Sequence, residues 1–219
     1  MKLYLSSFRV GDRSAELAEM CSGRRIGLIP NAMDDVAPEP RAVSNDKAIK
    51  ELVDLGIDVE VLNLRDYFGD QARLEAILAN LGGVWVRGGN TFVLRQAMKL
   101  SGFDGLLAER VGTDFFYGGY SAGICVLAPS LVGLGQVDDP EAMPYADSEV
   151  TWEGLGLLNY LILPHYKSDH RESATIDKEV EFCTRKGIPF RTLRDGEVLL
   201  LELPRDGGPS MDSPPSAEL

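Results

Sequence analysis

Short apolar runs alternate with stretches of helical periodicity along most of this chain of 219 residues. Runs rich in aliphatic and β-branched residues are typical of strands, and apolar residues spaced three or four apart are typical of helices. The predicted strands span residues 2–8, 25–30, 58–64, 83–87, 114–120 and 158–163. The predicted helices span residues 13–21, 40–55, 70–81, 91–100 and 172–186, with a short helix from Ser121. This alternation predicts an α/β fold in three αβα layers, with a mainly parallel sheet.

The pattern changes near the end of the chain. Two short apolar runs, 190–194 and 197–202, flank Asp195-Gly196. An Asp-Gly pair in this position is typical of a two-residue turn, so we expect the sheet to close in an antiparallel hairpin. Residues 204–219 are rich in Pro, Gly, Ser and Asp, a composition typical of a disordered tail. We therefore expect one α/β domain over residues 1–203.

The composition is that of a globular protein, with 44% hydrophobic and 26% charged residues. No apolar run approaches the roughly 18 residues that span a bilayer, and the start of the chain lacks the apolar core of an export signal. Cys21, Cys125 and Cys183 are widely spaced, which favours a reducing compartment over a disulfide framework or a zinc site. We expect a cytoplasmic monomer or homodimer without metal or cofactor.

The net charge of −12 changes the expected partners. Nucleic acid is an unfavourable partner, because binding to phosphates requires a basic face. An anionic substrate would need arginine or lysine side chains placed locally at its site.

The sharpest chemical motif is Gly119-Tyr120-Ser121-Ala122-Gly123, which directly follows a predicted strand. Glycines on both sides of a serine permit a tight strand-to-helix turn that projects the hydroxyl above the sheet edge. The Ala122 N–H would then stand at a helix N-terminus, where it can face a developing oxyanion. The alternative is a glycine turn whose serine only caps the helix.

A serine hydroxyl becomes a good nucleophile when a base takes its proton, and the chain has two histidines. His165 ends an apolar run and so lies at the carboxyl end of a strand, on the edge expected for Ser121. His170 lies in a polar stretch. We predict that His165 is the base; the alternative is a core histidine bonded to the backbone.

A third group should orient the imidazole. Among the carboxylates between the two residues, Asp138, Asp139 and Glu141 cluster in an acidic loop. Most acidic loop residues are simply solvated. We predict Asp139 as the third member, with Asp138 and Glu141 as alternatives.

A second glycine motif, Arg87-Gly88-Gly89-Asn90-Thr91, follows another predicted strand. Paired glycines let a backbone N–H approach a ligand closely, which would supply a second oxyanion donor. The alternative is an ordinary β-to-α turn in which Asn90 or Thr91 caps the next helix.

These motifs, together with Leu163-Pro164-His165-Tyr166, resemble the dipeptidase E (aspartyl dipeptidase) group of serine peptidases, which are related to cyanophycinase. The resemblance covers roughly residues 1–203. It implies a class I glutamine-amidotransferase-like fold in which serine replaces the cysteine nucleophile. It also implies hydrolysis of small peptides with an N-terminal acidic residue, without cofactor or metal.

The resemblance assigns a role to each motif. Ser121 would be the nucleophile and His165 the base, and Gly88 or Gly89 would join Ala122 as oxyanion donors. Arg171 would bind the aspartyl side chain of the substrate, and we expect Asn90 to contribute to substrate binding. The stretch from His165 to Arg171 is shorter here than in the bacterial aspartyl dipeptidases, and the acidic loop also differs in length.

Two other readings share some of these features. An α/β-type esterase also has a Gly-x-Ser-x-Gly motif, but His165 follows Ser121 by only 44 residues, which leaves little room for the strands and helices of that fold. A non-catalytic member of the amidotransferase-like fold would bind a small molecule, since fold does not fix function.

Overall fold

A computed structural model describes residues 1–146 and 148–205, and the predicted tail lies almost wholly outside the described residues. A six-stranded sheet with the order β3-β2-β4-β5-β1-β8 forms the centre of the protein. All neighbouring strands are parallel except β8, which runs antiparallel to β1. The strands are β1 (Lys2–Ser6), β2 (Arg25–Ile29), β3 (Asp58–Val61), β4 (Gly83–Val86), β5 (Phe116–Tyr120) and β8 (Val198–Glu202).

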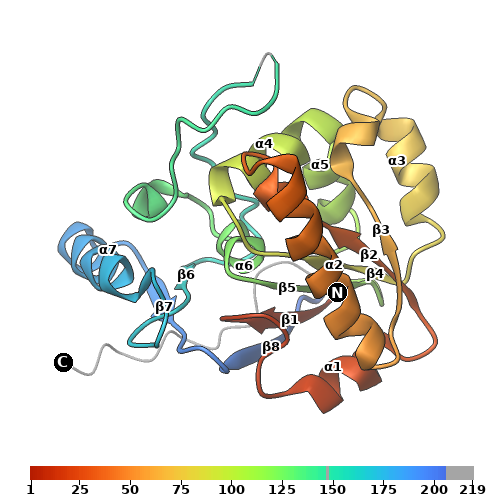
Figure 1. The fold of residues 1–219 in the computed structure, drawn as a ribbon, viewed down its shortest axis with the longest axis horizontal. Coiled ribbons are helices and arrows are strands. Elements are labelled where there is room, and N and C mark those ends of the chain that lie inside the picture. Colours follow the sequence, from red (N-terminus) through yellow and green to blue (C-terminus); the bar gives the residue numbers. More distant parts are fainter. Residues whose placement is uncertain (147, 206–219) are drawn as a thin grey trace.

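Helices cover both faces of this sheet (Figure 1). Successive strand residues point to opposite faces, so Tyr4 and Trp85 pack on one side, whereas Leu3 and Val86 pack on the other. The first face is covered by α1 (Ser14–Cys21) and α2 (Pro38–Asp54). The second is covered by α3 (Gln71–Leu78), α4 (Thr91–Ser101), α5 (Phe103–Ala108) and α6 (Ala122–Cys125). The predicted three-layer αβα fold is confirmed.

A second, two-stranded sheet lies to one side of the main sheet (Figure 1). It consists of β6 (Leu161–Leu163) and β7 (Phe190–Thr192), which are parallel and are connected by α7 (Ser173–Lys186). The predicted antiparallel hairpin around Asp195 is therefore wrong. The two strands that flank this residue find their hydrogen-bond partners in different sheets, β7 in β6 and β8 in β1.

The remaining differences from the predicted elements are local. The strand predicted over 58–64 stops at Val61, and Asn63 caps a following 3₁₀ turn. The short helix α5 was not predicted. The 3₁₀ turns of the described chain are η1 (Asn31–Met33), η2 (Leu64–Tyr67) and η3 (Val132–Leu134).

The register of the parallel strands brings several chain segments to one edge of the sheet. Val86 pairs with Gly119, and Ser6 pairs with Tyr120. The residues that follow β1, β4 and β5 therefore meet at their shared carboxyl edge, which is where ligands bind in sheets of this kind.

The carbonyl group of Val86 explains why glycine flanks Ser121 on both sides. A Cβ at Gly119 would lie 2.5 Å from this oxygen, and a Cβ at Gly123 would lie closer still. The turn that carries Ser121 thus packs directly on the end of β4, with no space for a side chain.

We expect Gly123→Ala to lower the free energy of unfolding by about 1–3 kcal/mol, because the added methyl group must displace the Val86 backbone. Chemical denaturation measures this change. Gly105→Ala is the matched control, since a Cβ added in α5 meets no atom within 4 Å. It should leave stability unchanged or raise it by about 0.4–1 kcal/mol. Equal stability of the two variants would contradict the packing argument.

Candidate active site

Ser121 occupies a strained turn between β5 and α6, with φ 51° and ψ −120°. A non-glycine residue with positive φ costs energy and is typical of a nucleophile elbow. The strand–turn–helix predicted around this serine is present. Gly88 lies against it, because a Cβ at Gly88 would be 2.8 Å from the Ser121 Cβ. The serine therefore stands beside the loop that follows β4.

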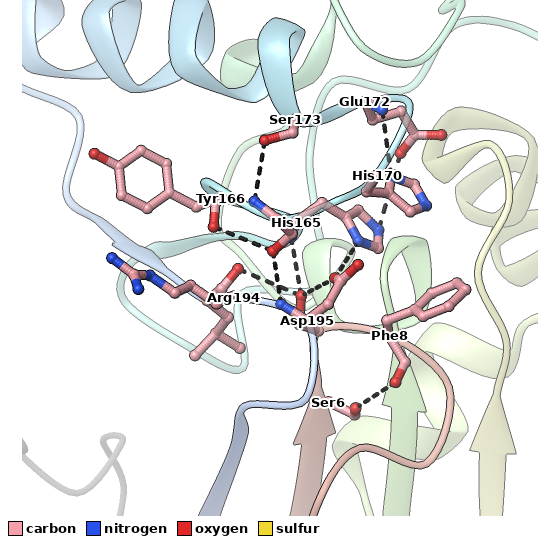
Figure 2. Close-up of polar contacts among 12 residues, drawn as sticks. Ser6, Phe8, His165, Tyr166, His170, Glu172, Ser173, Arg194 and Asp195 are labelled. Carbon is pink, nitrogen blue, oxygen red and sulfur yellow. Dashed lines mark hydrogen bonds and ion pairs between the residues drawn. The ribbon is translucent and has the colours of Figure 1, made fainter.

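His165 directly follows β6 and Pro164, and it is almost fully buried, with 1% of its surface exposed. Its backbone N–H donates to Ser7 Oγ over 2.9 Å. Its ring nitrogen Nδ1 lies 2.7 Å from Asp195 Oδ1 (Figure 2). When Nδ1–H donates to the carboxylate, Nε2 is left as an acceptor, which is the tautomer that a general base requires.

Asp195 is held in place by Ser168 and Ser7 in addition to His165. Its backbone N–H donates to Ser168 Oγ over 2.8 Å, and its Oδ1 lies 3.0 Å from Ser7 Oγ. Sequence reasoning missed both Asp195 and Ser7, because Asp195-Gly196 was interpreted only as a turn. The available signal was a carboxylate directly after a predicted strand that itself follows the histidine.

The prediction that Asp139 orients the imidazole is corrected by these contacts. The Asp139 carboxylate accepts the Glu141 N–H, and its carbonyl accepts from Asn90 Nδ2, each over 2.9 Å. Asp138 accepts the Thr91 N–H at the start of α4. The acidic loop thus caps α4, and none of the hydrogen bonds described for Asp138 or Glu141 involves the imidazole.

Asn90 also has a structural role. Its side-chain oxygen accepts the N–H groups of Phe92 and Val93, so it is the N-cap of α4. It does not line the pocket that contains Ser121. The predicted contact between Asn90 and a substrate therefore lacks support from this geometry.

The expected oxyanion donors lie at the correct edge. Gly88 and Gly89 line the same pocket as Ser121, and Ala122 is the first residue of α6, where an N–H has no acceptor within the helix. The Tyr120 ring packs on Gly88, because a Cβ at Gly88 would lie 2.9 Å from it. Gly89 is close-packed on the Ala32 carbonyl, which leaves no space for a side chain there.

A second histidine stacks on the first. The rings of His165 and His170 are 3.7 Å apart at an angle of 9°, and the ring of Phe8 meets both edge-on. Figure 2 shows His165 with Asp195 on one side and His170 and Glu172 on the other. Glu172 Oε2 lies 3.9 Å from His165 Nε2.

Burial is the main cause that lowers the pKa of His165 below its usual value of 6.5. The hydrogen bond that His165 donates to Asp195 opposes this shift, and the nearby His170 adds to it. The charges of the Asp195 and Glu172 carboxylates also oppose it. The net effect keeps the imidazole neutral at pH 7, so it is ready to accept a proton.

Ser121 and His165 line one pocket with a volume of about 320 Å³. Its charged lining residues are Arg9, Lys47, Glu51, Arg87, Arg171 and Glu172. Cations outnumber anions there, although the whole chain carries a charge of −12. The local charge therefore favours an anionic ligand.

His165, His170 and Glu172 are also close enough to be considered as metal ligands, since their ligand atoms lie within 4.8 Å of one another. The ring stack does not suit such a role. A metal ion binds in the plane of an imidazole, and two nearly parallel rings do not share a plane. The cluster is thus arranged for proton transfer and stacking.

A strained serine that shares a pocket with a buried, carboxylate-bonded histidine, at the carboxyl edge of a parallel sheet, is typical of a serine-type hydrolase. The chain belongs to peptidase family S51, whose profile matches residues 8–203. It is a serine-type peptidase.

The part of the chain that the structure describes contains no helix with the length and hydropathy of a membrane span.

Several relatives are similar over most of the chain. Peptidase E of Streptomyces coelicolor is 30% identical over 83% of this chain and 69% of its own length. An uncharacterized peptidase of Listeria innocua is 27% identical over 70% of this chain and 69% of its own length. Another, from Listeria monocytogenes, is 30% identical over 64% of this chain and 65% of its own length.

Solved structures share the fold. A crystal structure from Listeria monocytogenes, described as a peptidase E protein, superposes with a TM-score of 0.70 at 23% identity, over 92% of this chain and 98% of the other. A peptidase from an acI-B1 Actinobacterium superposes with a TM-score of 0.67 at 13% identity, over 92% and 83%. The expected glutamine-amidotransferase-like fold is thereby confirmed.

We expect the imidazole of His165 to titrate below pH 6.5, and lower still in Asp195→Asn, because the carboxylate is one of the groups that raise its pKa. Proton NMR of the two histidines measures both values, with His170→Gln used to assign the signals. The acidic limb of kcat/KM should follow the pKa of His165. A pKa that rises in Asp195→Asn would contradict this account of the site.

Proposed function

We propose that the protein hydrolyses short peptides, with a preference for an acidic N-terminal residue, through a triad of Ser121, His165 and Asp195. The observation that carries the proposal is the contact between His165 Nδ1 and Asp195 Oδ1 in a pocket that also contains Ser121. This arrangement supplies a nucleophile, a neutral base and a carboxylate that stabilises the imidazolium.

The reaction has two stages. Ser121 Oγ attacks the peptide carbonyl while His165 Nε2 takes its proton, and the oxyanion accepts N–H groups from Ala122 and Gly89. Gly88 and Gly89 both line the pocket, and we propose Gly89 as the second donor. The imidazolium then protonates the leaving amine, which breaks the C–N bond. Water activated by the same base releases the acid product and restores the serine.

The charge of the pocket supports the acidic preference. Arg87 is buried and donates to Ser44 and Asn45, so it is fixed in the wall. The Arg171 side chain is 87% exposed and contacts Glu172. Because the side chain is largely exposed, its guanidinium can turn from Glu172 toward a substrate carboxylate, which is the role that the resemblance implies.

A library of X–Leu dipeptides with varied X tests the activity. We expect wild-type protein to hydrolyse these peptides fastest when X is Asp or Glu, and Ser121→Ala to lose on the order of 10³-fold or more in kcat, because the nucleophile is removed. Release of free leucine is the measurement.

Ser22→Ala is the matched control for this experiment, because Ser22 is an exposed serine at the end of α1. It should hydrolyse the library at the wild-type rate. Unchanged hydrolysis by Ser121→Ala would refute the proposed nucleophile, and turnover of p-nitrophenyl esters without any peptide hydrolysis would favour an esterase.

The carboxylate of the triad can be tested separately. Asp195→Ala should lower kcat/KM by about 10²- to 10⁴-fold, because the imidazole loses the group that fixes its tautomer. Asp139→Ala should stay within a few fold of wild type, since its carboxylate accepts a hydrogen bond from Glu141 in its own loop. Steady-state kinetics on the best dipeptide measure both. The opposite ranking would restore Asp139 as the triad acid.

A further inference from the structure

The carboxylate of Glu172 stands on the reactive side of His165. Its Oε2 lies 3.9 Å from His165 Nε2, the nitrogen that must serve Ser121 (Figure 2). Glu172 is the N-cap of α7, yet its side chain makes no capping hydrogen bond. The requirements of the helix therefore do not explain why this carboxylate faces the pocket.

Glu172 differs from the other acidic residue in the described lining of the pocket. The carboxylate of Glu51 forms an ion pair with Arg9. Glu172 contacts Arg171 through Oε1, which leaves Oε2 directed toward His165. One carboxylate oxygen thus lies beside the reaction centre, where a cationic group of a ligand can reach it.

The chemistry of a peptide N-terminus fits this position. In an N-terminal residue the α-nitrogen is two bonds from the scissile carbonyl carbon, a distance of about 2.5 Å. During attack, that carbon is bonded to Ser121 Oγ, and the same oxygen shares its proton with His165 Nε2 at about 3 Å. The α-ammonium of such a substrate and the Glu172 carboxylate would therefore occupy the same pocket, close to His165 Nε2.

We propose that Glu172 binds the α-ammonium of the substrate and so makes the enzyme selective for peptides with a free N-terminus. The inference rests on the proposed peptidase function and adds the group that recognises the amine. A charge-assisted hydrogen bond forms only with a free amine. A residue N-terminal to the scissile one would replace that cation by a neutral amide.

A binding experiment in the Ser121→Ala background tests the proposal without turnover. The two probes are aspartyl-leucine and succinyl-leucine, which has the same skeleton but lacks the amino group and adds no bulk. Isothermal titration calorimetry should show that loss of the amine weakens binding roughly 10- to 100-fold, the value of a hydrogen bond to a charged group. In the Ser121→Ala/Glu172→Gln double variant, the ratio of the two dissociation constants should fall to roughly one to three.

Glu51→Gln in the same background is the matched control. It removes the other carboxylate of the pocket and should keep the preference for the amine, because Glu51 is already paired with Arg9. Thermal denaturation of each variant verifies that it is folded. An unchanged preference in Glu172→Gln would overturn the proposal, and so would an equal loss of affinity for both probes, which would indicate a structural role.

Failure of the proposed function gives a different result. It appears as hydrolysis of dipeptides that does not depend on Ser121, or as no hydrolysis at all by the wild-type protein. The binding ratio tests the amine site in either case, because it is measured in a variant without the nucleophile.

Discussion

The hydrogen bond between His165 Nδ1 and Asp195 joins two parts of the fold that are distant in the chain. His165 follows β6 in the small sheet, whereas Asp195 lies on the connection from that sheet to β8 of the main sheet. Ser7, at the end of β1, contacts both residues. Because the imidazole is buried, it would be an unsatisfied polar group without this partner. The position of the base therefore depends on how the small sheet docks against the carboxyl edge of the main one.

Backbone strain is concentrated around the same pocket. Of the four described non-glycine residues with positive φ, three line it: Arg9, Ser121 and His165. Each such conformation costs on the order of 1–3 kcal/mol and persists only where the surroundings enforce it. For Ser121 the close packing of two glycines on the Val86 carbonyl does so, and for His165 the Ser7 hydroxyl holds the backbone N–H. Ser121 and His165, the proposed nucleophile and base, are thus oriented by different elements that share one edge.

The sequence predicts the layered fold, and it predicts that Ser121 and His165 lie at one edge of the sheet, because these signals are local. Ser121 lies in a glycine-flanked motif after a strand, and His165 ends an apolar run. Asp195 has no comparable signal, since Asp-Gly between apolar runs is typical of a hairpin turn. Whether that turn closes a hairpin or connects two sheets is decided by long-range pairing, in this case of β8 with β1 and of β7 with β6. The acidic loop around Asp139 is a strong local signal that predicts a catalytic carboxylate. In the structure this loop caps α4 instead.

The proposed base and the two residues proposed to bind the substrate lie at opposite ends of one short connection. His165 is fixed by Ser7 and Asp195, which belong to other segments, whereas Arg171 and Glu172 lead into α7. Changes in the length or sequence of this connection can therefore alter the charges that face the pocket without displacing the imidazole. The fold alone does not determine specificity. Relatives that share the histidine–carboxylate pair can therefore differ in substrate through changes in the connection from His165 to Arg171. In this chain the short connection ends at Arg171 and Glu172, a cation and a carboxylate that are adjacent in the sequence and both line the pocket.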